Sequence, residues 1–390
     1  MEDLIKYKEG LITFLAPNLE KYRRGSHIEP AWAPVFYNPR MRLSRDIGVA
    51  LIEAYCNFTS KKNITIMEPL SATGVRGLRY AKEVKCVSKV YLNDLNRYAF
   101  KLIESNIRIN DLTERVECFN EDANALMYRF PEKIDVIDLD PFGSPAYFII
   151  SALKRIKHKG MICATATDLP PLLGIYPNVT WRRYFARSLR TEFGKEIGMR
   201  ILLGYFSREA ARLREGIKPL FVHATDHYFR VCVQVIDSPG VASKNEKSML
   251  GYLIYCRNCL YRGIVKNIEN RRLYCPICKQ DIEFAGPLWV GKMWNKCFVE
   301  HIYNSYAKRR YFDGRGLRIL EVIMEEVEAP RFYYKSDVIS KRYGMSRELS
   351  PRKYVTCLKR YDPTASRTHF DPKGFRTVLH PRFFVDRVGN

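Results

Sequence analysis

Between residues 64 and 165 the sequence alternates short apolar runs with segments of helical periodicity. The apolar runs are typical of buried strands and cover Ile64–Met67, Val90–Leu92, Val116–Phe119, Ile134–Ile137 and Met161–Ala164. The segments between them favour helices over Gly77–Val84, Tyr98–Asn110 and Tyr147–Ile156. This alternation predicts an α/β fold with a mostly parallel, doubly wound sheet, in which ligands bind at the carboxyl ends of the strands.

The last part of this region contains the segment Asp138–Pro145, with the sequence DLDPFGSP, directly after a predicted strand. Asp140 is placed to accept hydrogen bonds from an exocyclic amine, Pro141 stiffens the backbone, and Phe142 offers a flat ring for stacking. These properties favour binding of a planar amine. The alternative is an ordinary strand-to-loop turn, since Asp-Pro and Gly-Ser-Pro are common turn sequences.

Four successive predicted strands end at Gly74, Asp94, Asp122 and Asp140. The glycine pattern around Gly74 departs from the G-x-G-x-x-G fingerprint, which disfavours a pyrophosphate site. Asp94 stands twenty residues after Gly74, where an acidic side chain binds ribose hydroxyls, and Asp122 is suited to accept from an adenine amino group. The set predicts S-adenosylmethionine (AdoMet), a nucleoside without phosphates. Each acid is alternatively a simple helix cap.

Two arginines are candidates for the methionine carboxylate of AdoMet. Arg45 and Arg76 carry the planar guanidinium that pairs well with carboxylates. Their alternative is a solvated basic face.

The formal net charge of +23 over 390 residues predicts a polyanionic partner. No stretch approaches the ~20 consecutive apolar residues that cross a bilayer, so we expect no membrane association and favour nucleic acid. The first residues lack the basic and apolar regions of a signal peptide. Seven of the eleven cysteines lie singly in apolar surroundings and are predicted to be small buried residues. That usage is typical of a reducing, intracellular compartment, and we expect a cytoplasmic protein.

The other four cysteines form two C-x2-C pairs separated by fifteen residues: Cys256, Cys259, Cys275 and Cys278. This spacing is typical of a four-cysteine zinc site, in which each pair presents two thiolates from one tight turn. Because all four positions are cysteine and none is left for water, the spacing predicts a structural Zn²⁺. The alternative is a pair of redox dithiols.

Beyond the alternating region the pattern changes. Residues 181–215 favour a long basic helical stretch, residues 228–236 a strand, and the sequence Ser-Pro-Gly at 238–240 a boundary. After residue 310, helices near 319–327, 338–343 and 351–360 precede a possible hairpin at 371–374. The order of these elements resembles a winged helix-turn-helix.

The chain resembles the tRNA guanine-26 N2-dimethyltransferase family, in its compact archaeal type, over nearly its whole length. The motifs that carry the resemblance are Phe36–Pro39, Ser44–Asp46, Ser71–Tyr80, Asn93-Asp94, Asp138–Pro145, Thr165–Asp168 and the four-cysteine cluster. Two departures are visible: Ser44 stands where the family more often has Asn, and Leu169-Pro170-Pro171 follows where small residues are expected.

The resemblance implies an AdoMet-dependent enzyme that methylates the N2 amine of a tRNA guanine once or twice, with tRNA as partner and no obligate protein partner. Asp140 would be the catalytic carboxylate, with the Pro141 carbonyl beside it, and Phe36 and Phe142 would sandwich the guanine. The residues implied to contact AdoMet are Arg45, Arg76, Asp94, Asp122 and Ala123, beside Gly74 in the turn.

We therefore expect an AdoMet-dependent Rossmann-like methyltransferase domain over residues 1–238. An α+β C-terminal, tRNA-binding domain is expected over residues 239–390, with a zinc-ribbon-like module at about 252–282 and a winged-helix-like segment at about 312–385. Two alternatives are an amino-methyltransferase acting on rRNA, DNA or a protein glutamine, and a non-catalytic zinc and winged-helix RNA-binding protein. The row of strand-end acids speaks against the second.

Overall fold

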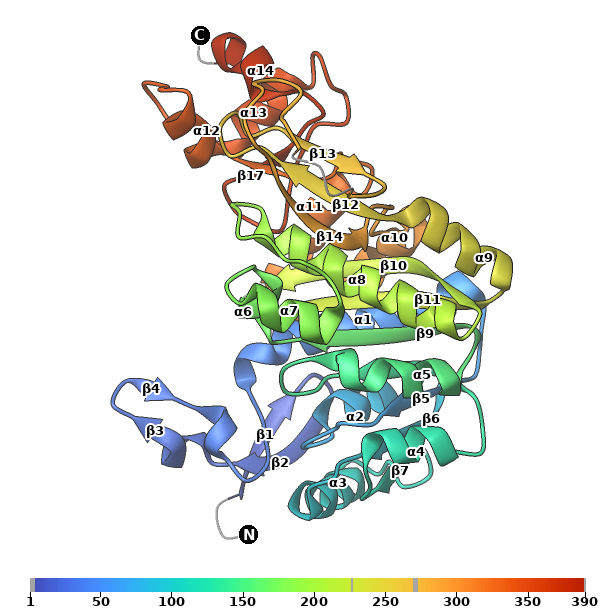
Figure 1. Cartoon of the computed structure of the whole chain (residues 1–390). Helices are drawn as coiled ribbons and strands as arrows, with labels where there is room; N and C mark the ends of the chain where they lie inside the picture. The colour runs from blue at the N-terminus through green and yellow to red at the C-terminus, as the bar shows by residue number, and fades with distance from the viewer. Residues whose placement is uncertain (1–3, 226, 269–272, 389–390) are drawn as a thin grey trace. The chain divides into compact units, whose positions relative to one another are not determined.

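The computed structural model describes residues 4–225, 227–268 and 273–388. The chain forms two compact units that are interleaved in sequence (Figure 1). The first unit comprises Met1–Pro141, Tyr147–Ala164 and Cys297–Leu320, and the second comprises Phe142–Ala146, Thr165–Lys296 and Glu321–Asn390. No division between these units falls after residue 238, and the two domains expected from the sequence stay a prediction.

The first unit contains five strands in the spatial order β9-β8-β5-β6-β7, in which every neighbouring pair is parallel. All five strands were predicted, and their bounds are β5 Ile64–Glu68, β6 Val87–Asn93, β7 Val116–Phe119, β8 Ile134–Leu139 and β9 Ile156–Ala166. β5 lies between β6 and β8, so the strand order reverses direction between β5 and β8. The carboxyl ends of these two strands therefore form the switch point at which doubly wound sheets bind ligands.

The predicted helices follow the strands, and the structure adds α4. The bounds are α1 Arg42–Thr59, α2 Val75–Glu83, α3 Arg97–Ile109, α4 Ala123–Arg129 and α5 Ile149–Arg155, after the short helix η4 Pro145–Phe148. Ile47, Leu51 and Tyr55 recur along one face of α1 and are fully buried. α2 packs against β6, and α4 packs against α5. The helices thus cover apolar strand faces and leave the strand ends open to the loops.

An N-terminal hairpin joins this unit through buried charges. β1 Leu4–Glu9 pairs antiparallel with β2 Ile12–Pro17. Arg79 of α2 is fully buried and contacts three carboxylates, those of Glu9, Asp46 and Glu83, at 2.9, 2.6 and 2.7 Å. Short elements follow the hairpin: η1 Leu19–Tyr22, β3 Arg23–Arg24, β4 His27–Ile28, η2 Pro30–Trp32 and η3 Pro39–Met41.

The third stretch of the first unit, at 297–320, returns to α1 and α2. It includes most of α10 Lys296–Ala307 and the start of α11 Gly314–Glu326. The backbone amide of Asp313 donates to Asp46 at 2.9 Å, and Arg309 pairs with Glu53 at 2.6 Å. A segment far along the sequence therefore completes the first unit.

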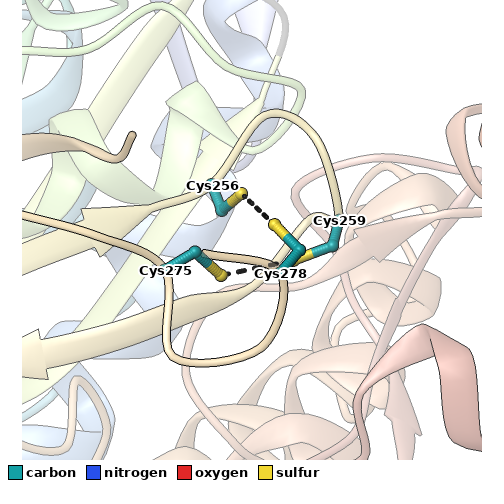
Figure 2. Close-up of side chains that lie close together, drawn as sticks. All are labelled: Cys256, Cys259, Cys275 and Cys278. Atoms are coloured by element: carbon teal, nitrogen blue, oxygen red, sulfur yellow. Dashed lines mark hydrogen bonds between the residues drawn. The ribbon is translucent and has the colours of Figure 1, made fainter. Parts of the chain in front are cut away.

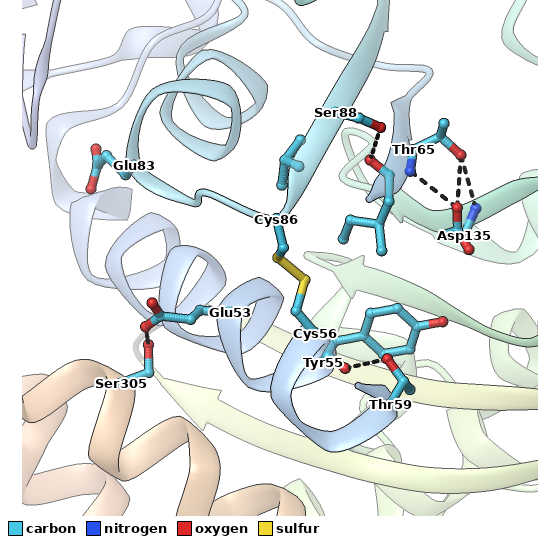
Figure 3. The surroundings of a disulfide bond; sticks show 12 residues. Glu53, Tyr55, Cys56, Thr59, Thr65, Glu83, Cys86, Ser88, Asp135 and Ser305 are labelled. Carbon is cyan, nitrogen blue, oxygen red and sulfur yellow. Dashed lines mark hydrogen bonds between the residues drawn. A yellow bond between two sulfur atoms is a disulfide. The ribbon is translucent and has the colours of Figure 1, made fainter. Parts of the chain in front are cut away.

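A disulfide joins Cys56 of α1 to Cys86, just before β6 (Figure 3). The prediction that the isolated cysteines are reduced was wrong for this pair, and Cys163 and Cys232 are also disulfide-bonded. Burial was predicted correctly for Cys56, Cys163 and Cys232, which are at most 5% exposed. It was wrong for Cys297, which is exposed, and for Cys86, Cys118 and Cys357, which are partly exposed. Cysteine usage therefore no longer supports a reducing compartment.

The second unit contains the antiparallel hairpin of β10 Glu215–Thr225 and β11 Tyr228–Asp237. The stretch at 181–215, predicted as one long helical region, divides instead into α7 Pro177–Tyr184 and α8 Gly194–Arg212, after the short α6 Leu169–Leu172. The break follows from Phe185, whose left-handed φ of 48° ends α7. α8 and β10 pack against each other.

The remainder of the second unit holds two small sheets. The order β13-β12-β14 is formed by β12 Leu250–Tyr255, β13 Arg262–Val265 and β14 Glu283–Trp289, after α9 Pro239–Lys244 and the π-turn η5 Asn245–Met249. The order β15-β17-β16 is formed by β15 Tyr334–Lys335, β16 Ser366–Arg367 and β17 Gly374–Arg376. α12 Ser336–Arg342 and α13 Pro351–Leu358 lie at two of the predicted helices, and α14 Pro381–Val388 follows the sheet. The winged-helix-like assignment stays a prediction. In the part of the chain that the structure describes, no helix is long and apolar enough to span a bilayer.

Candidate functional site

Asp140 lies at the predicted strand end. All six residues of β8 are buried, and Asp140, the first residue after β8 and its Leu139, has a side chain that is 22% exposed. Pro141 is buried. Phe142, the first residue of the segment that belongs to the second unit, is 68% exposed. The chain thus passes within two residues from a buried strand to an accessible aromatic ring, as a binding loop requires.

Arg76, near the start of α2, is the partner of Asp140. Its Nη2 donates to Asp140 Oδ2 at 2.5 Å and lies 3.4 Å from the Ser44 hydroxyl, and its Nε is 3.6 Å from Glu68 Oε1. Arg76 is 3% exposed. Its Nη1 is buried and has no hydrogen-bond partner among the described residues. A buried donor without a partner is costly, so this nitrogen is a ready donor for an oxygen of a bound molecule.

Glu68, the last residue of β5, is a site residue that the sequence analysis did not single out. Its Oε2 accepts from the Gly77 backbone amide at 3.0 Å. Burial raises the pKa of Glu68 well above its usual range, and the charges of Asp138 and Asp140 add to that effect against the opposing charge of Arg76. Burial therefore favours the neutral form of Glu68, and the contact of Arg76 with Asp140, at 2.5 Å, is shorter than its contact with Glu68, at 3.6 Å. The only sequence signal was its position at a strand end.

Asp138 has a structural partner. It is fully buried in β8, and its Oδ2 accepts from the Tyr80 hydroxyl of α2 at 2.7 Å. This contact anchors α2 to the strand that carries Asp140. The two aspartates of one segment therefore differ: Asp138 is enclosed by the fold, and Asp140 is partly accessible.

The turn after β5 brings Gly74 and Asp94 together as expected. Gly74 precedes α2 with a φ of +76°, a conformation that favours glycine. Asp94 accepts from the backbone amides of Ala72 and Asn96 at 2.8 and 2.9 Å. Burial raises its pKa above the usual range. Each carboxylate oxygen has two lone pairs, so Asp94 keeps capacity for a ligand hydroxyl while it holds the turn.

Asp122 caps a helix. Helix capping was the alternative to ligand binding for each acid at a strand end. Asp122 precedes α4, and its side chain accepts from the Ala125 amide at 2.9 Å. Asp122 is exposed, and Ala123 beside it is buried. A role for these two residues toward AdoMet stays a prediction.

Arg45 and Phe36 belong to the first unit and come from the N-terminal part of the chain. Arg45 is 5% exposed and forms two hydrogen bonds of 2.7 Å with Glu9. Glu9 consequently has a pKa of about 2, because the charges of Arg45 and Arg79 outweigh the effect of its burial. Phe36 is half-buried before η3. The roles of Arg45 toward AdoMet and of Phe36 toward the guanine stay predictions.

In the second unit, the residues after Phe142 are held by the Thr165–Asp168 motif. The Gly143 amide donates to the Thr167 hydroxyl at 2.8 Å. The Thr167 amide donates to the Gly143 carbonyl, also at 2.8 Å. Asp168 accepts from Tyr184 and Arg183 at 2.8 and 2.7 Å. The Tyr184 hydroxyl is also 2.7 Å from that of Ser144. The motif thus fixes the loop that presents Phe142, and the departure at residues 169–171 begins the short α6.

The four predicted cysteine ligands converge in the second unit (Figure 2). All four Sγ atoms lie within 4.8 Å of one another, and the pairs Cys256–Cys278 and Cys259–Cys275 are each 3.4 Å apart. Thiolates bound to one zinc at about 2.3 Å in a tetrahedron lie at comparable separations. The donor set and its geometry fit a four-coordinate metal.

The comparisons with known proteins agree with one another. A family model described as N2,N2-dimethylguanosine tRNA methyltransferase matches residues 20–388. A protein of Saccharolobus solfataricus named tRNA (guanine(26)-N(2))-dimethyltransferase is 36% identical over 371 residues, covering 95% of this chain and 94% of that protein. One from Aquifex aeolicus, named tRNA (guanine(26)-N(2)/guanine(27)-N(2))-dimethyltransferase, is 34% identical and covers 95% and 92%.

Among solved structures, Trm1 from Pyrococcus horikoshii in complex with S-adenosyl-L-methionine is similar to this chain with a TM-score of 0.84 and 29% identity. The similarity covers 98% of this chain and 99% of that chain.

Proposed function

The chain belongs to the N2,N2-dimethylguanosine tRNA methyltransferase family, and we propose that it transfers methyl groups from AdoMet to the N2 amine of guanine 26 in tRNA. It is an enzyme of the AdoMet-dependent tRNA (guanine-N2)-dimethyltransferase class, with the Rossmann-like fold of that class. The proposal assigns Asp140 as the carboxylate that contacts the amine.

The pairing of Arg76 with Asp140 at the β5–β8 switch point is the observation that carries this assignment. Asp140 combines partial exposure with a charge-assisted bond of 2.5 Å. A carboxylate held in this way is oriented before the substrate arrives, which avoids reorganisation during the reaction. Asp138, two residues earlier, is enclosed by the fold and has no access to a substrate.

The chemistry assigned to the loop follows from the weak nucleophilicity of guanine N2, whose lone pair is delocalised into the ring. When bound, AdoMet supplies an electrophilic methyl group. Asp140 and the Pro141 carbonyl accept the two N2 hydrogens, which favours a pyramidal nitrogen. Asp140 then stabilises the positive charge that develops and accepts the proton. Phe142 and Phe36 stack on the guanine after it leaves the RNA stack.

We assign the cofactor to the residues around the turn after β5. The unpartnered Nη1 of Arg76 supports its role as a donor to the methionine carboxylate. Gly74 supplies the positive φ of +76° at the turn, and Asp94 has the lone pairs to accept ribose hydroxyls. The remaining members of the set are Arg45, Asp122 and Ala123.

Incubation with an unmodified tRNA transcript and isotope-labelled AdoMet, followed by nucleoside mass spectrometry, tests the proposal. We expect mono- and dimethylguanosine at position 26 and no product with a transcript in which guanine 26 is replaced by adenine. Equal incorporation into both transcripts, or into an rRNA or DNA fragment alone, would contradict it.

We propose that the four cysteines hold one structural Zn²⁺. Zinc would join the two C-x2-C turns, so that Cys256 and Cys259 are fixed against Cys275 and Cys278. Metal analysis of the purified protein should give one zinc per chain, and Cys275→Ser should lose that zinc and lower the melting temperature. A zinc-free protein with the same stability would refute the assignment.

The partner and location follow from the same proposal. The net charge of +23 supports tRNA as the polyanion, and we propose that the enzyme acts in the cytoplasm. We also propose that residues 239–390 bind the tRNA.

A further inference from the structure

A groove of about 410 Å³ lies beside the proposed zinc site within the second unit. It is bordered by the first C-x2-C turn and its flanks on one side and by α12 on the other, and its lining residues are Tyr255, Arg257, Leu260, Val338, Lys341 and Arg342. Its volume falls within the range of small-ligand sites, which is about 300–1,000 Å³. We call these six residues the knuckle groove.

The two walls of the knuckle groove are fastened to each other. Arg342 Nη2 donates to the Arg257 carbonyl at 2.6 Å, and the Tyr343 hydroxyl donates to the Cys259 carbonyl at 3.1 Å. Both acceptors belong to the Cys256–Cys259 turn. The groove is therefore a built feature of the fold whose shape depends on the metal-binding turn.

The floor of the groove is apolar and well supported. Tyr255 and Leu260 are 2% and 3% exposed. The Tyr255 hydroxyl donates to Glu192 at 2.9 Å, and Arg262 pairs with the other oxygen of Glu192 at 2.8 Å. Because Glu192 is neutralised by Arg262, it does not cancel the positive charges at the rim.

Three cations line the groove, and two of them are uncompensated. Arg257 pairs with Glu283. Lys341 and Arg342 are exposed, and within the described ranges neither forms an ion pair. Of the nearby carboxylates, Asp337 and Glu348 share the single cation of Lys373, and neither pairs with Lys341 or Arg342 among the described residues. An excess of positive charge over an apolar floor complements a polyanion that also carries flat or apolar surface, which is the chemistry of an RNA strand.

We propose that the knuckle groove binds a phosphodiester segment of the tRNA substrate, with Lys341 and Arg342 on phosphates and the half-buried Val338 against a ribose or base. The inference rests on the proposed function, and it extends that function by giving the zinc module a direct part in holding RNA. The metal thereby shapes one wall of a substrate site as well as joining two turns.

Lys341→Ala is the sharpest test, because the side chain is exposed and forms no hydrogen bond or ion pair with the residues that the structure describes. Binding of the full-length protein to tRNA is measured over a series of KCl concentrations. Losing one phosphate contact should reduce the slope of log K against log[KCl] by about 0.7–0.9, which weakens binding on the order of 5–10-fold near 0.1 M salt. Lys341→Arg should restore the affinity.

Lys85→Ala is the matched control, since Lys85 is an exposed lysine outside residues 239–390 and does not line the groove. It should bind tRNA as the wild type does. Calorimetry with AdoMet should give the same affinity for both variants, so that the defect of Lys341→Ala lies in RNA binding alone.

Wild-type affinity and salt slope in Lys341→Ala would overturn the groove assignment. That result would leave the proposed function intact if the wild-type enzyme still methylates tRNA. A wild type that binds tRNA in the groove and transfers no methyl group would reject the function instead. A fluorescent probe bound in the groove gives a competition assay. If poly-glutamate displaces the probe and tRNA does not, the occupant is an acidic protein and the proposal is overturned.

Discussion

The substitution Asp140→Asn separates the chemistry of the active site from the stability of the fold. The amide has nearly the same shape as the carboxylate, and its oxygen can still accept from Arg76. The change removes one of the carboxylate charges that raise the pKa of Glu68, so Glu68 is freer to ionise beside Arg76, 3.6 Å away. We therefore expect the loss of stability to stay within about 1.5–3 kcal/mol, the range of one hydrogen bond to a charged group.

Methyl transfer should respond much more strongly. The amide of this variant cannot accept a proton, and its own hydrogens would face the hydrogens of the guanine amine. Loss of a general base lowers the rate by roughly 10²–10⁴, or about 3–5 kcal/mol in the barrier. Single-turnover transfer from labelled AdoMet with saturating tRNA measures this loss. Calorimetry should find that AdoMet still binds to the variant.

Tyr80→Phe is the control, because it perturbs the other aspartate of the same segment. It removes the hydroxyl that donates to Asp138 at 2.7 Å, in a fully buried place. We expect about 1–3 kcal/mol of lost stability with methyl transfer preserved. A wild-type single-turnover rate in Asp140→Asn would refute the reasoning, and so would an equal loss of rate in Tyr80→Phe, which would show that any disturbance of β8 stops the reaction.

Three further predictions concern stability. Arg79→Met leaves three buried carboxylates short of a cation and should cost about 3–5 kcal/mol in urea unfolding, whereas a change below about 1 kcal/mol would contradict the buried-network account. Burial would raise the pKa of Glu326, but the charges of His369 and Arg376 lower it to about 2. The contribution of ionised Glu326 to the free energy of unfolding should thus be complete above about pH 4.5 and disappear as the pH falls toward 2. The urea midpoint should follow that decline in the wild type and less steeply in Glu326→Gln. Cys86→Ser opens a loop of 30 residues and should cost about 3–4 kcal/mol, and an unchanged melting temperature would mean that the bond contributes nothing.

Local patterns were sufficient for much of the fold. The five parallel strands were predictable because strands that are buried on both faces have continuous runs of apolar residues. β10 was not predicted, since Lys218 and Pro219 interrupt its apolar pattern and the register shifts there. The break after α7 was also missed, because a left-handed residue such as Phe185 leaves no mark in the hydrophobic period.

The candidate site was likewise predictable from the sequence only in part. The convergence of the four cysteines and the strand-end position of Asp140 were predictable, because metal-ligand spacing and strand ends are local features of sequence. The partners were not, since Glu9 meets Arg45 across 36 positions and Tyr80 meets Asp138 across 58. Cys56 and Cys86 were assigned to the wrong chemical state because sequence spacing says nothing of the distance between α1 and β6.

The interleaved course of the chain affects how the protein is made on the ribosome. Between Ala164 and Leu320 roughly 160 residues are added, which takes on the order of 10–30 s at ordinary translation rates. During that interval Asp46 lacks the amide of Asp313, and Glu53 lacks Arg309. The first unit therefore stays incomplete while most of the second unit is synthesised. A fragment ending at residue 238 would lack the segment that closes it, so a shortened enzyme should retain residues up to 320.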